Sequence, residues 1–350
     1  MTEQSPVGTA EAPQKPIDHS WWVSIALILA LIVLTALFVD VQEMIQVMRH
    51  TNPALALAGI VSLLLGIAII DFRWWYLLSR RTAFKRLLHV THVSYLVPML
   101  TPIPNYISRV VITSASTDVS LPQATTGMVV ERMIAQIMRI TTIVLAISLG
   151  AQSELSAASM IRSVAISVAV LIAYLLAIKY ATAVAAAVHR LLTAVRLKPS
   201  WTEKITAMME DALCTNVGMK ELLFSLGMTI VMWTFFFFFH FLVILAMPLG
   251  LDLQARATIA MGALALTPPS APAMFGIYQL SQIGPGLILR FGEVDDLLPY
   301  SLMLYFIQLV VWMGLTLIGL RALKMRFVDL FRIRNVTLVS SEEDASSGCS

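Results

Sequence analysis

Apolar runs of about 20 residues recur along this chain, and they restrict its fold more than any other feature. A run of that length crosses the ~30 Å hydrocarbon layer of a membrane as an α-helix. Apolar residues make up 58% of the 350 residues and charged residues only 13%, which is too little charge to cover a soluble domain of this length. The sequence therefore predicts an all-α, polytopic membrane protein.

Six runs are long enough to cross the bilayer outright; they are residues 21–39, 53–71, 127–149, 161–180, 221–247 and 299–320. Basic residues gather in segments 72–87 and 181–220 and again after residue 320. Basic segments favour the cytoplasmic side of a membrane. We therefore expect a bacterial inner-membrane protein with both termini in the cytoplasm.

The same pattern predicts the organisation of the chain. Residues 1–20 contain three prolines among small polar residues, and we expect this segment to be disordered. Residues 21–325 are expected to form a single transmembrane domain, within which 181–220 is a cytoplasmic loop. Residues 326–350 are expected to form a cytoplasmic tail.

Two further apolar stretches, residues 87–126 and 256–289, are interrupted by prolines; these are Pro98, Pro102 and Pro104 in the first stretch and Pro268, Pro269 and Pro272 in the second. Each stretch has ~35–40 residues, which suffices for two short helices and is marginal for two full spans. The predicted orientation places both ends of each stretch on one side of the membrane. We therefore expect two re-entrant hairpins, one from each face, with the prolines near their tips.

The two stretches are related by a weak internal sequence repeat. Thr101-Pro102 is followed by Leu121-Pro122 and a long span, and Thr267-Pro268 is followed by Leu298-Pro299 and another long span. Two halves of opposite orientation that carry broken helices match the inverted-repeat plan of transporters.

Charged residues also occur where hydrocarbon is expected: Arg109, Glu131, Arg132 and Arg139. A charge at this depth costs at least ~2.5–3.5 kcal/mol, so it normally faces a cavity or a partner. Arg132, Gln136 and Arg139 share one helix face because they are spaced i, i+4, i+7. Glu131 lies ~100° around the helix, where it can pair with Arg109.

These residues allow three interpretations. Arginine side chains and helix N-termini both bind phosphate, so the cluster is a candidate site for an anionic lipid headgroup. Alternatively, Glu131 and an arginine form a structural ion pair that holds the hairpin, or Arg132 extends to the cytoplasmic headgroups. Arg139 distinguishes best among these three interpretations. It lies ~18 Å along its helix, so its side chain does not easily reach either membrane surface.

The second half contains a neutral polar group of residues: Tyr278, Gln279, Tyr305 and Gln308. They are candidates for the other side of a cavity, although polar groups of this kind more often bond between helices. His240 is interpreted as a packing histidine rather than a proton relay.

The chain shows no recognisable metal, cofactor or catalytic motif. Its two cysteines and six histidines have no metal-ligand spacing. A nucleotide-binding P-loop is also absent from the sequence, so any transport would use a gradient or be passive. We expect membrane lipids as partners and no nucleic acid, while the sequence identifies no protein partner.

Three segments resemble a known family, the transmembrane region of lysylphosphatidylglycerol synthetases and its stand-alone flippase-like relatives. TPIPNYISR (101–109) is similar to the family's proline-led turn that ends in arginine. The pair Glu131-Arg132 is similar to the family's ER pair, and PAMFGIYQ (272–279) to its proline- and glycine-rich turn. The chain departs from the family where Gln279 replaces a usual glutamate and where Arg109 lacks a preceding glycine–glutamate.

This resemblance implies a flippase-like protein that translocates or presents an anionic polar lipid between leaflets. The C-terminal aminoacyl-transfer domain of the full synthetases has no counterpart in this sequence, so we do not expect an enzyme. Two alternatives remain open: a membrane-embedded enzyme that modifies a lipid phosphate, and a non-catalytic partner in envelope-lipid assembly. The sequence identifies neither the lipid nor the direction of transport.

Overall fold

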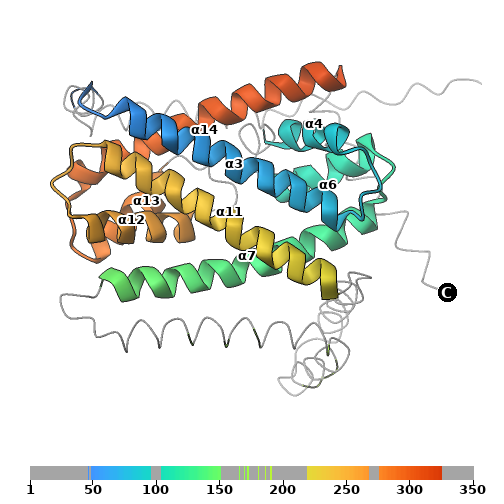
Figure 1. The fold of residues 1–350 in the computed structure, drawn as a ribbon, viewed down its shortest axis with the longest axis horizontal. Helices are drawn as coiled ribbons and strands as arrows, with labels where there is room; N and C mark the ends of the chain where they lie inside the picture. The colour runs from blue at the N-terminus through green and yellow to red at the C-terminus, as the bar shows by residue number, and fades with distance from the viewer. Residues whose placement is uncertain are drawn as a thin grey trace, which may run out of the picture.

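The computed structural model describes residues 49–95, 104–150, 219–267 and 276–324, together with a few isolated positions between them. All the regular elements in these ranges are α-helices (Figure 1). Their bounds are α3 Pro53–Leu77, α4 Phe84–Ser94, α6 Asn105–Ser116, α7 Leu121–Gly150, α11 Met219–Ala246, α12 Leu253–Leu266, α13 Ile277–Ile288 and α14 Val294–Leu323.

Four helices are long and apolar enough to cross a membrane: α3, α7, α11 and α14. They correspond to four of the six predicted spans. The other two, 21–39 and 161–180, lie outside the described residues, as do 1–20, 326–350 and almost all of 181–220.

The prediction was wrong about the segment after the first of these spans. Residues 72–87 were expected to be a basic cytoplasmic segment outside the span, but α3 continues to Leu77 and α4 begins at Phe84. Arg73 therefore lies on a helix, where its side chain is buried. Hydropathy alone ends a span at its first charges, whereas a helix continues when those charges find partners inside the protein.

Each proline-containing stretch holds two short helices that pack against one another, α4 with α6 and α12 with α13. Pro104 is the N-cap residue of α6, while Pro102, Pro268, Pro269 and Pro272 lie outside the described residues. The broken-helix pairs are thus present; their re-entry from opposite membrane faces stays a prediction.

The two halves of the structure repeat one order of elements: a long helix, two short helices and a second long helix. In Figure 1, α3 and α11 lie side by side and run in opposite directions. Two hydrogen bonds join the antiparallel pair. At one end the Asn52 amide donates to the Ala246 carbonyl, and near the other end Arg73 donates to Thr229. This is the arrangement expected of an inverted repeat.

The same symmetry governs the contacts between the halves. The second long helix of each half packs on the first short helix of the other, α7 on α12 and α14 on α4. The Gln254 side chain of α12 donates to the Leu149 carbonyl of α7 at 2.7 Å. In the equivalent contact, Thr316 of α14 donates to the His92 carbonyl of α4 at 2.9 Å.

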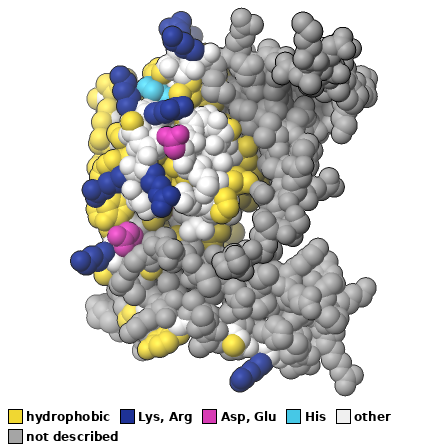
Figure 2. All heavy atoms as spheres, turned by 90° about the vertical axis from the view of Figure 1, so that its right-hand side faces the viewer, with side chains coloured by type: hydrophobic (Ala, Val, Ile, Leu, Met, Phe, Trp, Pro, Cys, Tyr) yellow, Lys and Arg dark blue, Asp and Glu magenta, His cyan; other side chains and the backbone are white. Residues whose placement is uncertain are grey.

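The two ends of the helix bundle differ in the sign of their charged residues. Figure 2 shows basic side chains gathered at the end where α3 and α14 finish and α4 begins. The basic residues there are Arg80, Arg81, Lys85, Arg86, Lys220, Arg321 and Lys324. Acidic residues predominate at the opposite end, where Asp252, Glu293, Asp295 and Asp296 begin α12 and α14.

The contact between α14 and α4 depends on a glycine. A Cβ at Gly319 would lie 2.8 Å from the His89 carbonyl oxygen, whereas a Cβ at Gly314 of the same helix would meet nothing within 4 Å. We expect Gly319→Ala to lower the free energy of unfolding by about 1–3 kcal/mol, the usual cost of overpacking. Gly314→Ala is the matched control, and thermal unfolding in detergent compares the two. Equal stability of both variants would contradict this packing.

Candidate functional site: a buried charge triad beside a central cavity

A buried carboxylate joins three helices. Glu131 of α7 accepts hydrogen bonds from two arginines: Arg73 Nη2 of α3 donates to Oε1 at 2.9 Å, and Arg109 Nη2 of α6 donates to Oε2 at 2.5 Å. All three side chains are buried. The predicted pairing of Glu131 with Arg109 is present, and Arg73 adds a second cation that was missed because its segment was assigned to the cytoplasmic side of the membrane.

The two arginines of this triad have further partners. Arg73 Nη1 donates to Thr229 Oγ1 of α11, and the Arg109 guanidinium lies 4.6 Å from the centre of the Trp74 ring. A cation above an aromatic face is stabilised by the ring quadrupole. The triad thus connects four helices from both halves of the chain.

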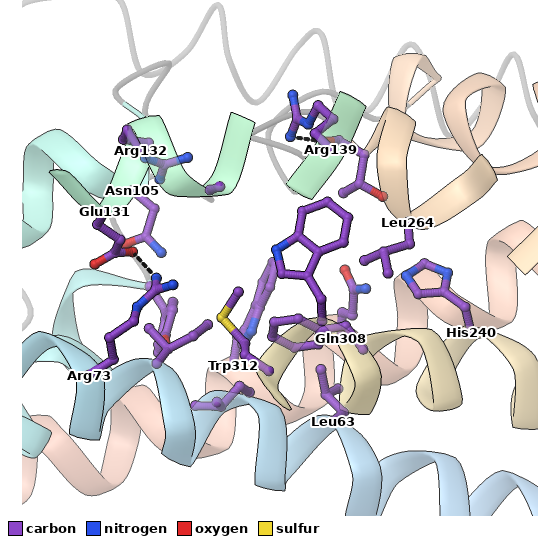
Figure 3. A pocket seen from close by; sticks show the side chains of 18 residues that line it. Leu63, Arg73, Asn105, Glu131, Arg132, Arg139, His240, Leu264, Gln308 and Trp312 are labelled. Carbon is purple, nitrogen blue, oxygen red and sulfur yellow. Dashed lines mark hydrogen bonds and ion pairs between the residues drawn. The ribbon is translucent and has the colours of Figure 1, made fainter. Parts of the chain in front are cut away.

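A cavity of about 230 Å³ lies between the two halves, beside the triad (Figure 3). Its polar lining residues are Arg73, Asn105, Glu131, Arg132, Arg139, His240, Thr267 and Gln308. Aromatic residues complete much of the rest, among them Tyr95, Trp233, Phe236 and Trp312. In Figure 3 the charged groups Arg73 and Glu131 lie at one end of the cavity, and the neutral groups His240 and Gln308 lie at the other.

Three of the four predicted site residues on α7, namely Glu131, Arg132 and Arg139, line the cavity, and Gln136 does not. Arg132 lies 4.3 Å from the centre of the Tyr106 ring, and Arg139 Nη2 donates to the Thr267 carbonyl at 2.9 Å. Gln136 is exposed and outside the lining, where Ala135 takes its place. Arg132, Ala135 and Arg139 face the cavity with i, i+3, i+7 spacing, and Gln136 at i+4 lies outside this face.

The predicted residues of the second half divide in the same way. Gln308 lines the cavity, whereas Tyr278 is buried and packs its ring 5.5 Å from that of Tyr305. Gln279 Oε1 accepts from the Gly276 amide at 2.5 Å, which closes the turn before α13. Gly276 has φ 90°, a backbone conformation that favours glycine. Tyr278 and Tyr305 therefore pack against one another, as the sequence favoured, whereas Gln279 caps the start of its own helix.

His240 combines packing with a place on the cavity wall. Its side chain is buried, and its Nδ1 lies 3.3 Å from the Tyr300 hydroxyl. This contact is that of a packing histidine with a hydrogen-bond partner, as expected from the sequence.

Both broken-helix pairs open onto this cavity. Tyr95 and Thr267 follow the last residues of α4 and α12, Asn105 is the first residue of α6, and all three line the wall. A helix N-terminus presents unpaired amide groups to anions. The start of α6 therefore adds partial positive charge to a wall that already holds arginines.

The balance of charge in the lining is positive. The lining contains three arginines, Arg73, Arg132 and Arg139, and one carboxylate, Glu131. Both oxygens of that carboxylate are bound by Arg73 and Arg109. Within the described ranges, no three His, Cys, Asp or Glu side chains gather as metal ligands would. Guanidinium groups such as these can bind an anion through pairs of N–H donors.

Comparison with known proteins places this arrangement in a family. The family model described as lysylphosphatidylglycerol synthase TM region matches residues 21–293, which include α3 to α13 and end just before α14. Neither curated proteins nor solved structures give a significant match to the chain.

The triad predicts a specific pattern of stability. Glu131→Gln leaves Arg73 and Arg109 buried without their counter-ion, and we expect a loss of about 3–5 kcal/mol in the free energy of unfolding. The double variant Arg73→Met/Glu131→Gln returns the net charge of the cluster from +2 to the wild-type +1 and should regain part of that loss. Gln136→Ala, an exposed change on the same helix, is the control. Titration into denaturing detergent measures the wild type, both single variants Arg73→Met and Glu131→Gln, the double variant and the control, and additive losses in the double variant would contradict the triad.

Proposed function

The chain belongs to the lysylphosphatidylglycerol synthase transmembrane-region family, and we propose that it binds an anionic lipid headgroup in the central cavity and moves or presents that lipid between leaflets. Four long apolar helices and the family make it an integral membrane protein. The proposal adds the ligand, its binding site and its movement.

The observation that carries this proposal is the surplus of arginine in the cavity. Among the described residues, Arg132 and Arg139 form no salt bridge with a carboxylate, although both line the wall. A cation in a low-dielectric region is costly without a counter-charge. A lipid phosphate supplies that charge and matches the planar donor geometry of the guanidinium group.

The remainder of the lining suits the rest of a lipid. Trp233, Phe236 and Trp312 offer apolar surface next to the arginines, and the neutral groups His240 and Gln308 offer hydrogen bonds to hydroxyls or esters. Charged groups, neutral hydrogen-bonding groups and aromatic surface within one cavity fit a phosphate and the glycerol region attached to it.

The inverted repeat supplies a means of movement. The cavity lies between two halves that run in opposite directions, so rocking of one half against the other would expose it to each leaflet in turn. We place the basic end of the bundle in the cytoplasm of a bacterial cell, because basic residues favour that side of the inner membrane.

Glu131 supports this role rather than an enzymatic one. Both of its oxygens are bound by arginines, which leaves the carboxylate poorly suited to hold a metal ion or to accept a proton from a substrate. We therefore propose that Glu131 positions Arg73 and Arg109 and takes no part in catalysis.

Lipid retention tests the proposal directly. We expect the purified protein in mild detergent to retain an anionic phospholipid enriched over the bulk membrane, as measured by mass spectrometry. Arg132→Gln and Arg139→Gln should each reduce that enrichment about tenfold or more, because each removes a charged contact of about 1.5–3 kcal/mol.

Arg49→Gln is the matched control, since Arg49 is exposed at the opposite end of the bundle from the basic residues. Its lipid retention should equal that of the wild type. Arg139 also holds the Thr267 carbonyl, so the Arg132 variant separates headgroup binding from helix packing. Equal enrichment in wild type and both cavity variants, with folding intact, would refute the headgroup site.

A further inference from the structure

A second buried polar pair lies beside the triad and has no role in headgroup binding. Asp71 Oδ2 of α3 lies 3.2 Å from His92 Nε2 of α4, and the exposed fractions of the two residues are 1% and 7%. Neither residue belongs to the cavity lining. A buried carboxylate whose hydrogen-bond partner is a histidine, rather than an arginine, can gain or lose a proton as a pair.

The pair belongs to a line of titratable groups along α4. His89 lies one turn earlier on the same helix face, nearer the basic end, and its ring centre is 6.4 Å from that of His92. Tyr95 lies on the other side, with its ring 6.4 Å from His92 and stacked at 30°. His89 is partly exposed, and Tyr95 lines the cavity. The line therefore runs from the basic end of the bundle to the cavity.

Each member of this line has a buried polar atom without a hydrogen-bond partner among the described residues; these atoms are His89 Nδ1, His92 Nδ1, Asp71 Oδ1 and Tyr95 Oη. Such atoms are uncommon in folded proteins, because each costs about 1–3 kcal/mol. The ring centres of His89 and His92 and of His92 and Tyr95 are 6.4 Å apart, so a proton that moves along this line would cross between the rings through bridging water.

The charged groups around the pair limit what it can bind. Asp71 faces His92, Arg109 of α6 and Glu131 of α7, while His89 faces His92 and Lys85. Arg73 acts on Tyr95 from α3. The groups contributed by α11 and α14 are the neutral Thr229 and Thr316. The Arg73–Glu131–Arg109 triad has one surplus positive charge, which disfavours a metal cation here, whereas a proton shared by Asp71 and His92 needs no further ligands.

The pair also lies at a contact between the two halves. The His92 carbonyl accepts from Thr316 Oγ1 of α14 at 2.9 Å, and the Tyr95 ring stacks on Trp312 of α14 at 5.9 Å. A change of charge on His92 therefore acts on the surface where α4 and α14 meet, and these helices come from different halves.

We infer that His89, His92, Asp71 and Tyr95 form a proton pathway, with the Asp71–His92 pair as its proton-binding site. A proton enters at His89, is held between His92 Nε2 and Asp71 Oδ2, and leaves toward the cavity past Tyr95. The pair gains one positive charge while it holds the proton, and every group returns to its starting charge after the proton has left. The inference rests on the proposed function in one respect only: it makes the proton the ion coupled to lipid movement.

Nuclear magnetic resonance of the full chain in lipid nanodiscs tests the binding site without reference to transport. In ¹⁵N-histidine-labelled protein, His92→Gln identifies the His92 signals by their absence. We expect the wild-type His92 signals to differ between acidic and basic buffer, and Asp71→Asn to alter that difference. His50→Gln, an exposed change at the acidic end, should leave it unchanged. His92 signals that are the same in acid and in base overturn the inference.

Proton flux tests the pathway. In proteoliposomes with an internal pH-sensitive dye and an imposed membrane potential, we expect wild-type protein to admit protons when phosphatidylglycerol is present. His92→Gln and Tyr95→Phe should lose that flux, whereas Asp118→Asn, an exposed acid at the basic end, should keep it. If the wild type moves labelled phosphatidylglycerol at one rate with and without a proton gradient, the pathway is refuted and the proposed function stands. If His92 titrates but no anionic lipid binds or moves, the proton site stands and the proposed function fails.

Discussion

A single buried carboxylate organises the centre of this protein. Glu131 binds Arg73 and Arg109 at once, and Arg73 continues to Thr229 on α11. Separating buried charges from their partners costs several kcal/mol, so these contacts hold α3, α6, α7 and α11 in one arrangement around the cavity. Both carboxylate oxygens are bound by Arg73 and Arg109, and the neighbouring Arg132 and Arg139 form no salt bridge with a carboxylate among the described residues.

The two halves contribute different groups at equivalent positions of the cavity wall. Glu131 and Gln308 occupy equivalent positions when each half is counted from its Leu-Pro pair, Leu121-Pro122 and Leu298-Pro299, and both line the cavity. The first half thus supplies the cations and their carboxylate, and the second half supplies neutral hydrogen-bonding groups. A headgroup that spans the cavity would place its phosphate near α7 and its neutral part near α14. The equivalent contacts α7–α12 and α14–α4 are the surfaces across which the halves would slide.

The sequence predicted the features that depend on local composition, and it missed those that depend on long-range pairing. Apolar length predicted α3, α7, α11 and α14, and the prolines predicted two pairs of short helices. Helical spacing placed Arg132 and Arg139 on one face, but it did not exclude Gln136, because only the packed neighbours decide where the cavity edge lies. Arg73 was assigned to a basic cytoplasmic segment, and Asp71 at the end of its predicted span was not among the candidate site residues. Their partners Glu131 and His92 lie on other helices, and a single sequence does not reveal that proximity.

The central claim is that an anionic headgroup occupies the cavity beside the triad. An electron cryo-microscopy structure of the full chain in nanodiscs that contain phosphatidylglycerol tests it most directly. The account predicts headgroup density in the cavity, with its phosphate in contact with Arg132 and with either Arg73 or Arg139. Phosphatidylglycerol density confined to the outer surface of the helices, with the cavity closed by its own side chains, would contradict it.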